Sequence, residues 1–272
     1  MPRLAVEDDR SLYYEHHRGA GPTVLLIHGW GASCRVWDAV TAALVDAGRA
    51  VLTYDQRGCG HSDKDFAAND VALGIRDAVA LVDHLGLDAV VVNGWSLGGA
   101  VAVGAAHALG GRCAGVVLTG GATPRYVQGP DFPHGGEAEG VAQTVAALRA
   151  DRPAFLWQLA TAVCAEEPAP GINDWLRSIF WQTSPAADAA LASLAQLDQR
   201  AELASLEVPV LSMIGDQDAF VDPAIGRIAA ELAPQGRLSE YEGVGHAPFL
   251  ERAERYRAEL LEFLAMLESD LD

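Results

Sequence analysis

The fold of this chain is decided by the stretch Val90-Val91-Val92-Asn93-Gly94-Trp95-Ser96-Leu97-Gly98-Gly99. The three valines predict a buried strand, and the small residues from Ala100 onward predict a helix. Between them the pattern G-x-S-x-G predicts a sharp turn, because side chains at positions 94 and 98 would collide with the neighbouring strand and helix. Such a turn exposes the hydroxyl of Ser96, which makes this residue a candidate nucleophile.

Continuous apolar runs on both sides of this stretch predict further strands buried on both faces, as in a parallel sheet. Polar turns and helical patterns separate the runs. The order of these segments predicts a doubly wound, mostly parallel α/β sheet, preceded by a hairpin within residues 4–18. The other predicted strands are Thr23–Ile27, Ala50–Tyr54, Gly115–Thr119, Val208–Ile214 and Leu238–Tyr241.

Nearly 90 residues separate the predicted strands at 115–119 and 208–214, although a parallel crossover needs only about a dozen. Helical patterns fill this interval, which predicts an inserted helical cap. We therefore expect a core domain made of residues 1–122 and 207–272, and a cap made of residues 123–206. The cap helices are expected at 138–149, 153–165, 173–182 and 185–197, the last of them capped by Ser184.

Composition excludes several classes of partner. The chain has 272 residues with 37 acidic and 19 basic side chains, and its formal net charge of −18 would repel nucleic acid and anionic lipid. No leader pattern and no apolar run of about 18 residues occurs, which predicts a cytoplasmic protein with no membrane partner. The cysteines lack metal-ligand spacing and are expected to be free thiols, so we expect neither a metal nor a cofactor.

A serine nucleophile needs a histidine base, which in turn needs a carboxylate to orient it. His246 is the favoured base because it follows a predicted strand in a loop flanked by glycine. Three aspartates follow the predicted strand at 208–214 and precede this histidine, in the chain order that such sites use, namely Asp216, Asp218 and Asp222. Asp218 is favoured, since a loop of its length can turn back over the sheet edge, whereas Asp222 precedes a proline and suits a helix N-cap.

Acyl transfer also needs donors for the developing oxyanion. The backbone N–H of Leu97 follows the candidate nucleophile, and that of Trp30 belongs to the loop after His28-Gly29, so both are candidates. His28 itself is expected to be structural. The side chains of Trp30, Trp157 and Trp181 are candidates for an apolar substrate pocket, although each tryptophan could instead hold the cap helices together. The loop from Asp55 to Ser62 is expected to be a structural turn pinned by Asp55 and Arg57.

Five motifs occur in a fixed order, and together they resemble the α/β-hydrolase superfamily over essentially the whole chain. They are His28-Gly29-Trp30-Gly31, Asp55-x-Arg57-Gly58-x-Gly60-x-Ser62, Gly94-Trp95-Ser96-Leu97-Gly98-Gly99, Gly215-x-x-Asp218 and Gly245-His246-Ala247-Pro248. The resemblance implies that Ser96, Asp218 and His246 match the family's triad and that Trp30 and Leu97 match its oxyanion positions. Within the superfamily the motifs look like those of pimeloyl-carrier-protein methyl ester esterases and of the cofactor-free haloperoxidase/esterase branch.

These observations predict a serine carboxylesterase that acts on a small-molecule ester with an apolar acyl group. Hydrolysis of lactones, hydrolysis of carbon–carbon bonds and perhydrolysis use the same triad and remain alternatives. A receptor that binds a small apolar molecule on the same scaffold, with little or no turnover, is the alternative from a different class. A p-nitrophenyl ester assay separates the receptor from the enzymes.

Overall fold

The computed structural model describes residues 2–166 and 169–269. Within them, eight strands form one sheet in the order β1-β2-β4-β3-β5-β6-β7-β8. The first three strands in this order pair antiparallel and all later neighbours pair parallel, so the mostly parallel sheet and its opening hairpin are confirmed. The strands are β1 (Arg3–Glu7), β2 (Arg10–His17), β3 (Ala20–Ile27), β4 (Arg49–Tyr54), β5 (Val90–Trp95), β6 (Cys113–Thr119), β7 (Val210–Gly215) and β8 (Gly236–Tyr241).

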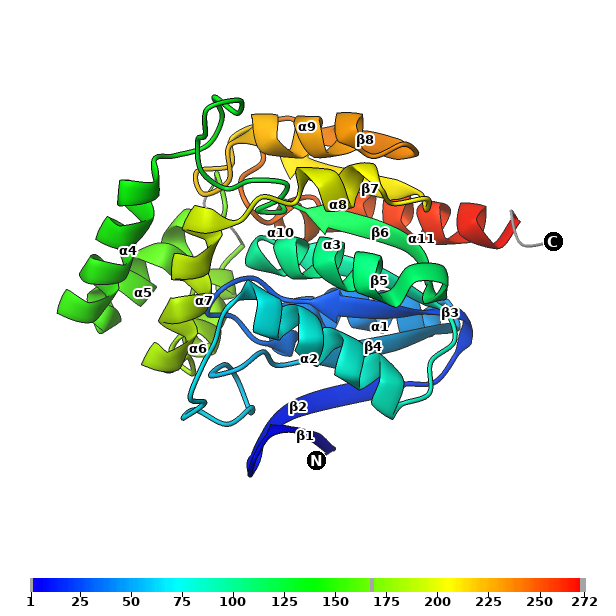
Figure 1. Ribbon diagram of the computed structural model, residues 1–272, viewed down its shortest axis with the longest axis horizontal. Coiled ribbons are helices and arrows are strands. Elements are labelled where there is room, and N and C mark those ends of the chain that lie inside the picture. Colours follow the sequence, from blue (N-terminus) through cyan, green and yellow to red (C-terminus); the bar gives the residue numbers. More distant parts are fainter. Residues whose placement is uncertain (1, 167–168, 270–272) are drawn as a thin grey trace.

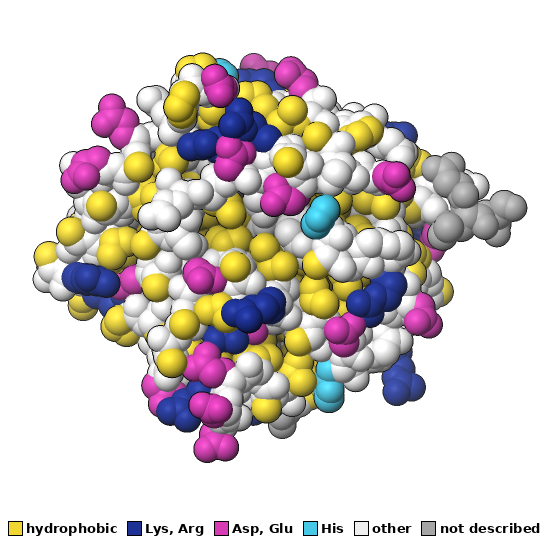
Figure 2. All heavy atoms as spheres, viewed as in Figure 1, with side chains coloured by type: hydrophobic (Ala, Val, Ile, Leu, Met, Phe, Trp, Pro, Cys, Tyr) yellow, Lys and Arg dark blue, Asp and Glu magenta, His cyan; other side chains and the backbone are white. Residues whose placement is uncertain are grey.

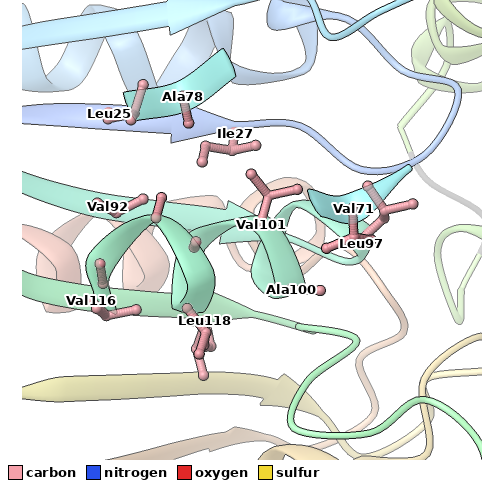
Figure 3. Close-up of a cluster of buried hydrophobic side chains, with 14 of the residues drawn as sticks. Leu25, Ile27, Val71, Ala78, Val92, Leu97, Ala100, Val101, Val116 and Leu118 are labelled. Carbon is pink, nitrogen blue, oxygen red and sulfur yellow. The ribbon is translucent and has the colours of Figure 1, made fainter. Parts of the chain in front are cut away.

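Helices cover both faces of the sheet, and each face has its own core. Val92 of β5 faces the core that Figure 3 shows, where strand side chains meet Val71 and Val101 of α2 and α3. Val91 points to the opposite face, against α1 and α11, because side chains alternate along a strand. The covering helices are α1 (Asp38–Asp46), α2 (Val71–His84), α3 (Leu97–Leu109), α8 (Arg200–Ala204), α9 (Pro223–Leu232), α10 (Pro248–Glu251) and α11 (Ala253–Ser269).

The strand order reverses between β3 and β5. From β3 the chain moves outward to β4, and then returns across the sheet to β5 on the other side of β3. Ligands of doubly wound sheets bind outside the carboxyl ends of the strands at such a reversal. Trp30 follows β3 and Ser96 follows β5, so the fold brings these two residues to that position.

The segment between β6 and β7 is helical, as the sequence predicts, and Figure 1 shows α4 to α7 gathered at one end of the sheet. Its helices are α4 (Ala138–Ala150), α5 (Arg152–Ala162), α6 (Ile172–Phe180) and α7 (Asp188–Ser193), followed by α8, which packs on α3. The expected helix at 185–197 is broken into α7 and a 3-10 turn on each side of it. Ser184 does not cap it, because its hydroxyl donates to the carbonyl of Lys64 instead.

Charged side chains of both signs are interspersed over the face in Figure 2 and do not gather into one patch. The Asp8-Asp9 turn of the hairpin has Asp8 at φ 41°, a conformation that aspartate tolerates better than most residues. No helix within residues 2–166 and 169–269 combines the length and the apolar character that crossing a membrane requires.

Candidate active site

The sharp turn predicted at Ser96 is present between β5 and α3. Ser96 has φ 57° and ψ −123°, and it is one of two non-glycine residues with positive φ in the described chain. A Cβ on Gly94 would lie 2.1 Å from the carbonyl oxygen of Gly98, and a Cβ on Gly98 would lie 2.5 Å from that of Ile27. Only glycine fits at either position, so the backbone can hold Ser96 in this strained conformation above the sheet.

His246 and Asp218 form a buried pair that leads toward this turn. Nδ1 of His246 lies 2.7 Å from Oδ2 of Asp218, and their side chains are 5% and 2% exposed. The other carboxylate oxygen of Asp218 accepts hydrogen bonds from the backbone N–H groups of Phe220 (2.8 Å) and Val221 (3.0 Å). The carboxylate is therefore fixed in orientation, and it can hold the imidazole with Nδ1 as donor and Nε2 free to act as a base.

The backbone of His246 is held on both sides. Its N–H donates to the carbonyl of Val163 at 2.9 Å, and its carbonyl accepts from Nε1 of Trp95 at 2.8 Å. The rings of Trp95 and Phe220 lie 5.4 and 5.2 Å from the imidazole, centroid to centroid. These contacts come from β5, from the loop after β7 and from the segment after α5, so three parts of the chain fix the position of this ring.

One cavity of about 260 Å³ joins these residues, because Ser96, Leu97, His246 and Trp30 all line it. A Cβ on Gly29 would lie 3.1 Å from the Cβ of Ser96, so the loop before Trp30 passes directly against the candidate nucleophile. Leu97 is the first residue of α3, and the first N–H groups of a helix have no acceptor within it. The rest of the lining is mainly apolar and includes Phe155, Leu159, Val163, Phe180, Leu191 and Leu194.

Trp30 lies in this cavity, but Trp157 and Trp181 do not line it, and the expectation for these two side chains needs correction. They are 47% and 54% exposed on α5 and just after α6, with ring centroids 6.2 Å apart. The guanidinium of Arg177 lies 3.6 Å from the centroid of Trp157. The two indoles therefore pair with each other and with a cation on the outer surface, while Phe155 and Phe180 line the cavity from the same two helices.

The structure adds two positions that the sequence analysis missed. Oε1 of Glu251 accepts from the N–H of Gly245 at 2.9 Å and Oε2 accepts from that of Ala165 at 2.8 Å. This carboxylate thus joins the loop that carries His246 to the segment after α5, and burial raises its pKa. The second position is Gly120, where a Cβ would lie 3.2 Å from both Oδ2 of Asp218 and Nδ1 of His246. No motif singled out either residue; only the five-residue spacing from His246 to Glu251 hints at proximity.

His28 lies in the buried interior beneath the Trp30 loop, as expected of a structural residue. Its Nε2 accepts from the N–H of Gln56 at 2.9 Å, and its Nδ1 lies 2.7 Å from the carbonyl of Gly29. Nδ1 is therefore the protonated nitrogen. Burial lowers the pKa of this imidazole, so it remains neutral and holds the two loops together.

Asp55 and Arg57 both fix their loop, but through different partners. Asp55 accepts from the backbone N–H groups of Cys34 and His61, whereas Arg57 pairs with Asp77 and Glu7. The loop is a structural turn, as the sequence suggests. Within the residues described, no three histidine, cysteine, aspartate or glutamate side chains are grouped so as to hold a metal ion.

Comparison with known proteins extends over nearly the whole chain. Residues 24–259 match the model of the Alpha/beta hydrolase family. A non-heme haloperoxidase from Rhodococcus erythropolis is 31% identical, with 97% of this chain and 99% of that protein covered. A pimeloyl-(acyl-carrier protein) methyl ester esterase from Stenotrophomonas maltophilia is 33% identical, with coverage of 92% and 95%. The crystal structure of a bromoperoxidase from Bacillus anthracis superposes with a TM-score of 0.89 at 28% identity, covering 94% and 96%.

Proposed function

The chain belongs to the alpha/beta hydrolase family, and from this premise we propose that it hydrolyses carboxylic esters with an apolar acyl group through a covalent acyl-enzyme. One observation carries the proposal. Ser96 on its strained turn and His246, paired with Asp218, open into the same mainly apolar cavity. The family membership and the esterases among its relatives support hydrolase activity. We propose in addition that the substrates are carboxylic esters and that Ser96, His246 and Asp218 form the catalytic triad.

The reaction would proceed in two halves. Oγ of Ser96 attacks the ester carbonyl carbon while Nε2 of His246 takes its proton, and the N–H groups of Trp30 and Leu97 bind the resulting oxyanion. The tetrahedral intermediate expels the alcohol, which receives that proton from His246. Water then adds to the acyl-enzyme in the same way and releases the acid and free Ser96. Asp218 keeps the imidazole in the tautomer that can accept a proton and stabilises the imidazolium that forms.

We propose the segment of residues 123–206 as the cap that closes this site. Its helices contribute Phe155, Phe180 and Leu191 to the cavity wall. Two contacts fasten it to the sheet domain next to the site: Nε1 of Trp30 donates to the carbonyl of Ala187 at 2.9 Å, and the hydroxyl of Thr183 donates to that of Gly31. An apolar wall of this kind favours an apolar acyl group and limits the access of water.

The proposal is tested with Ser96→Ala and p-nitrophenyl butyrate. Loss of the nucleophile should lower kcat/KM by about 10³-fold or more. Thermal stability should change little, because removing one hydroxyl from a cavity wall leaves no void in the core. Ser178→Ala is the control, since Ser178 is exposed and its hydroxyl only donates to the carbonyl of Trp175 within α6. Wild-type protein that binds esters without cleaving them would support the receptor alternative instead.

Perhydrolysis is the second candidate, and the haloperoxidase and bromoperoxidase names of the relatives favour it. In that reaction hydrogen peroxide replaces water in the second half, so that the acyl-enzyme yields a peracid and free Ser96. Peracid formation from acetate esters and peroxide, followed by oxidation of a halide or dye, would detect it. Ser96→Ala should abolish this activity together with esterase activity.

A further inference from the structure

A second cavity lies directly beside the one that contains Ser96. It measures about 530 Å³ and lies between the loop after β6, the start of α4 and the loop after β7. Five residues line both cavities: Tyr126, Thr144, Leu191, Ala219 and Phe220. The two spaces therefore adjoin along these residues. Ser96 and His246 do not line the second cavity, although Asp218 does.

The proposed reaction fixes which part of an ester points toward this partition. The carbonyl oxygen faces the N–H groups of Trp30 and Leu97, and the leaving oxygen must face His246, because that ring returns its proton to it. Phe220 stacks beside His246 with ring centroids 5.2 Å apart, and it also lines the second cavity. An alcohol portion that extends past His246 would therefore reach Phe220 and the space behind it.

The sizes of the two cavities support the same division. A volume of about 260 Å³ lies below the roughly 300–1,000 Å³ of typical sites for small molecules. The cavity at Ser96 can hold an acyl chain, but an acyl chain and a bulky alcohol together need more room. The neighbouring space supplies about 530 Å³, and Val127, Val141 and Pro223 give it an apolar wall.

We propose that this second cavity is the binding site for the alcohol portion of the ester and that it accepts bulky uncharged alcohols. The carboxylates of Glu137, Asp218 and Asp222 border it, and no lysine or arginine is among the described residues that line it, so an anionic alcohol would be disfavoured. This assignment rests on the proposed esterase function. The cavity at Ser96 binds the acyl half of the ester, and the second cavity binds the alcohol half.

Two glycines allow this cavity to be filled selectively. Gly140 in α4 and Gly136 in the preceding loop both line it, and a Cβ on either would meet no atom within 4 Å. Gly140→Phe should therefore fold, since it also replaces a poor helix former. Gly136→Leu fills the same space from a different segment. Gly111→Phe is the matched control, because Gly111 is equally open and lies at the amino end of β6, away from the strand ends that carry the site.

The readout is a pair of butyrate esters that differ only in the alcohol. For cyclohexyl butyrate, each cavity-filling variant should lower kcat/KM by tenfold or more, mainly through a higher KM. For methyl butyrate the change should stay within twofold, and Gly111→Phe should affect neither ester. Cyclohexanol should inhibit the wild type and should inhibit both variants at least tenfold less.

Three outcomes would overturn the assignment. Equal losses on both esters would mean that the substitutions act on the fold or on the cavity at Ser96. Unchanged kinetics in both variants would mean that the alcohol leaves by another route. A wild type that cleaves neither ester would remove the proposed function itself, and this result differs from the other two because it appears before any variant is made.

Discussion

Three aspartates within seven residues illustrate how much depends on the single side chain. Asp218 contacts His246, Asp216 accepts from the N–H of Gly243 at 2.7 Å, and Asp222 accepts from that of Ala224 at 2.9 Å as the N-cap of α9. Chain order admits all three as the orienting acid. The structure separates them, because only Asp218 lies within hydrogen-bond distance of an imidazole.

Asp218→Asn should lower kcat by about 10³–10⁴-fold, because the amide can no longer favour the catalytic tautomer or stabilise the imidazolium that forms in the transition state. Asp216→Asn and Asp222→Asn should retain activity within a few-fold, since asparagine still accepts a backbone hydrogen bond and is a good N-cap. Steady-state kinetics on p-nitrophenyl butyrate checks all three. If Asp216→Asn or Asp222→Asn lost activity while Asp218→Asn remained active, that other aspartate would be the residue that orients His246.

His28 gives the fold a dependence on pH with a definite sign. Burial lowers the pKa of the folded imidazole below its ordinary value of 6.5, so below that pH the unfolded chain binds a proton that the folded chain does not. The free energy of unfolding should therefore decrease as the pH falls from 6.5 to 5, by up to about 1.4 kcal/mol per pH unit for this one proton.

His28→Asn should be less stable at pH 8, because asparagine cannot reproduce both ring hydrogen bonds, and it should lose less stability on acidification. Urea unfolding of both proteins at several pH values measures the two slopes. His61→Asn serves as the comparison, because it removes a histidine that is exposed in the folded protein. Equal slopes for wild type and His28→Asn would show that His28 titrates alike in both states.

Among the helices and strands, the sequence predicts those that are determined by residues close together in the chain. The buried strands, the turn at Ser96 and helix α9 follow from apolar runs, from glycines and from a proline after an N-cap. The N-cap expected at Ser184 fails because its hydroxyl bonds to a carbonyl more than one hundred residues earlier in the chain, although residues 185–196 are helical as α7 and two 3-10 turns. Trp157 and Trp181 fail likewise, since periodicity places them on helices but does not say which face meets the sheet domain.

Besides the hydrogen bond from His246 to Val163, the carboxylate of Glu251 links the segment after α5 to the His246 loop, and its contribution can be measured. Glu251→Gln keeps one acceptor oxygen but places the amide NH2 group, itself a donor, against the second N–H group, so either Gly245 or Ala165 loses its acceptor. We expect kcat to fall about tenfold, because small displacements of a general base are costly. Glu254→Gln on the exposed start of α11 is the control.

A fluorophosphonate that reacts with the active serine distinguishes positioning from stability in this variant. If Glu251 positions His246, every Glu251→Gln molecule should still be labelled at saturation, and kcat per labelled site should be low. A labelled fraction that falls in proportion to kcat would reduce the role of Glu251 to general stability.

The helices between β6 and β7 should influence specificity through the side chains that reach the cavity. Phe155→Ala removes a ring of α5 from the cavity wall and so enlarges the cavity. It should therefore shift the preference among p-nitrophenyl esters toward longer acyl chains. Trp181→Ala should leave that preference unchanged, because its indole lies on the outer surface. The measurement is kcat/KM for p-nitrophenyl esters from acetate to decanoate. A shift in the Trp181 variant alone would support the prediction from sequence that Trp181 contacts the substrate.

For the molecule as a whole, the sequence predicts the sheet and the position of the site but not the cavities. Both cavities depend on how the helical segment docks over the strand ends, through contacts such as that of Trp30 with Ala187, 157 residues apart. The contact of Glu251 with Ala165 likewise exists only in that docked arrangement. A sequence pattern indicates the local preference for helix, strand or turn. It does not indicate which surface a distant segment of the chain will cover.

The four cysteines report on the integrity of this arrangement, because they are distributed over both cores and the loops between them. All are free, as the sequence predicts, and the structure shows that all are buried; burial raises the pKa of Cys113 to about 11 and of Cys59 and Cys164 to about 12. Burial raises the pKa of the Cys34 thiol as well. Since the thiolate is the reactive form, native protein at pH 8 should react with dithiobis(nitrobenzoate) only as fast as it opens.

All four thiols should therefore react at once in guanidinium chloride, whereas the native enzyme should stay unlabelled and fully active over the time of an assay. Four equal slow rates would report a single cooperative opening of the sheet and its helices. Rapid labelling of Cys164 alone would instead show that the segment after α5 opens independently of the sheet, since this cysteine lies next to the residues that Glu251 fastens. Loss of activity in step with that labelling would then tie the closed position of the segment to the catalytic position of His246.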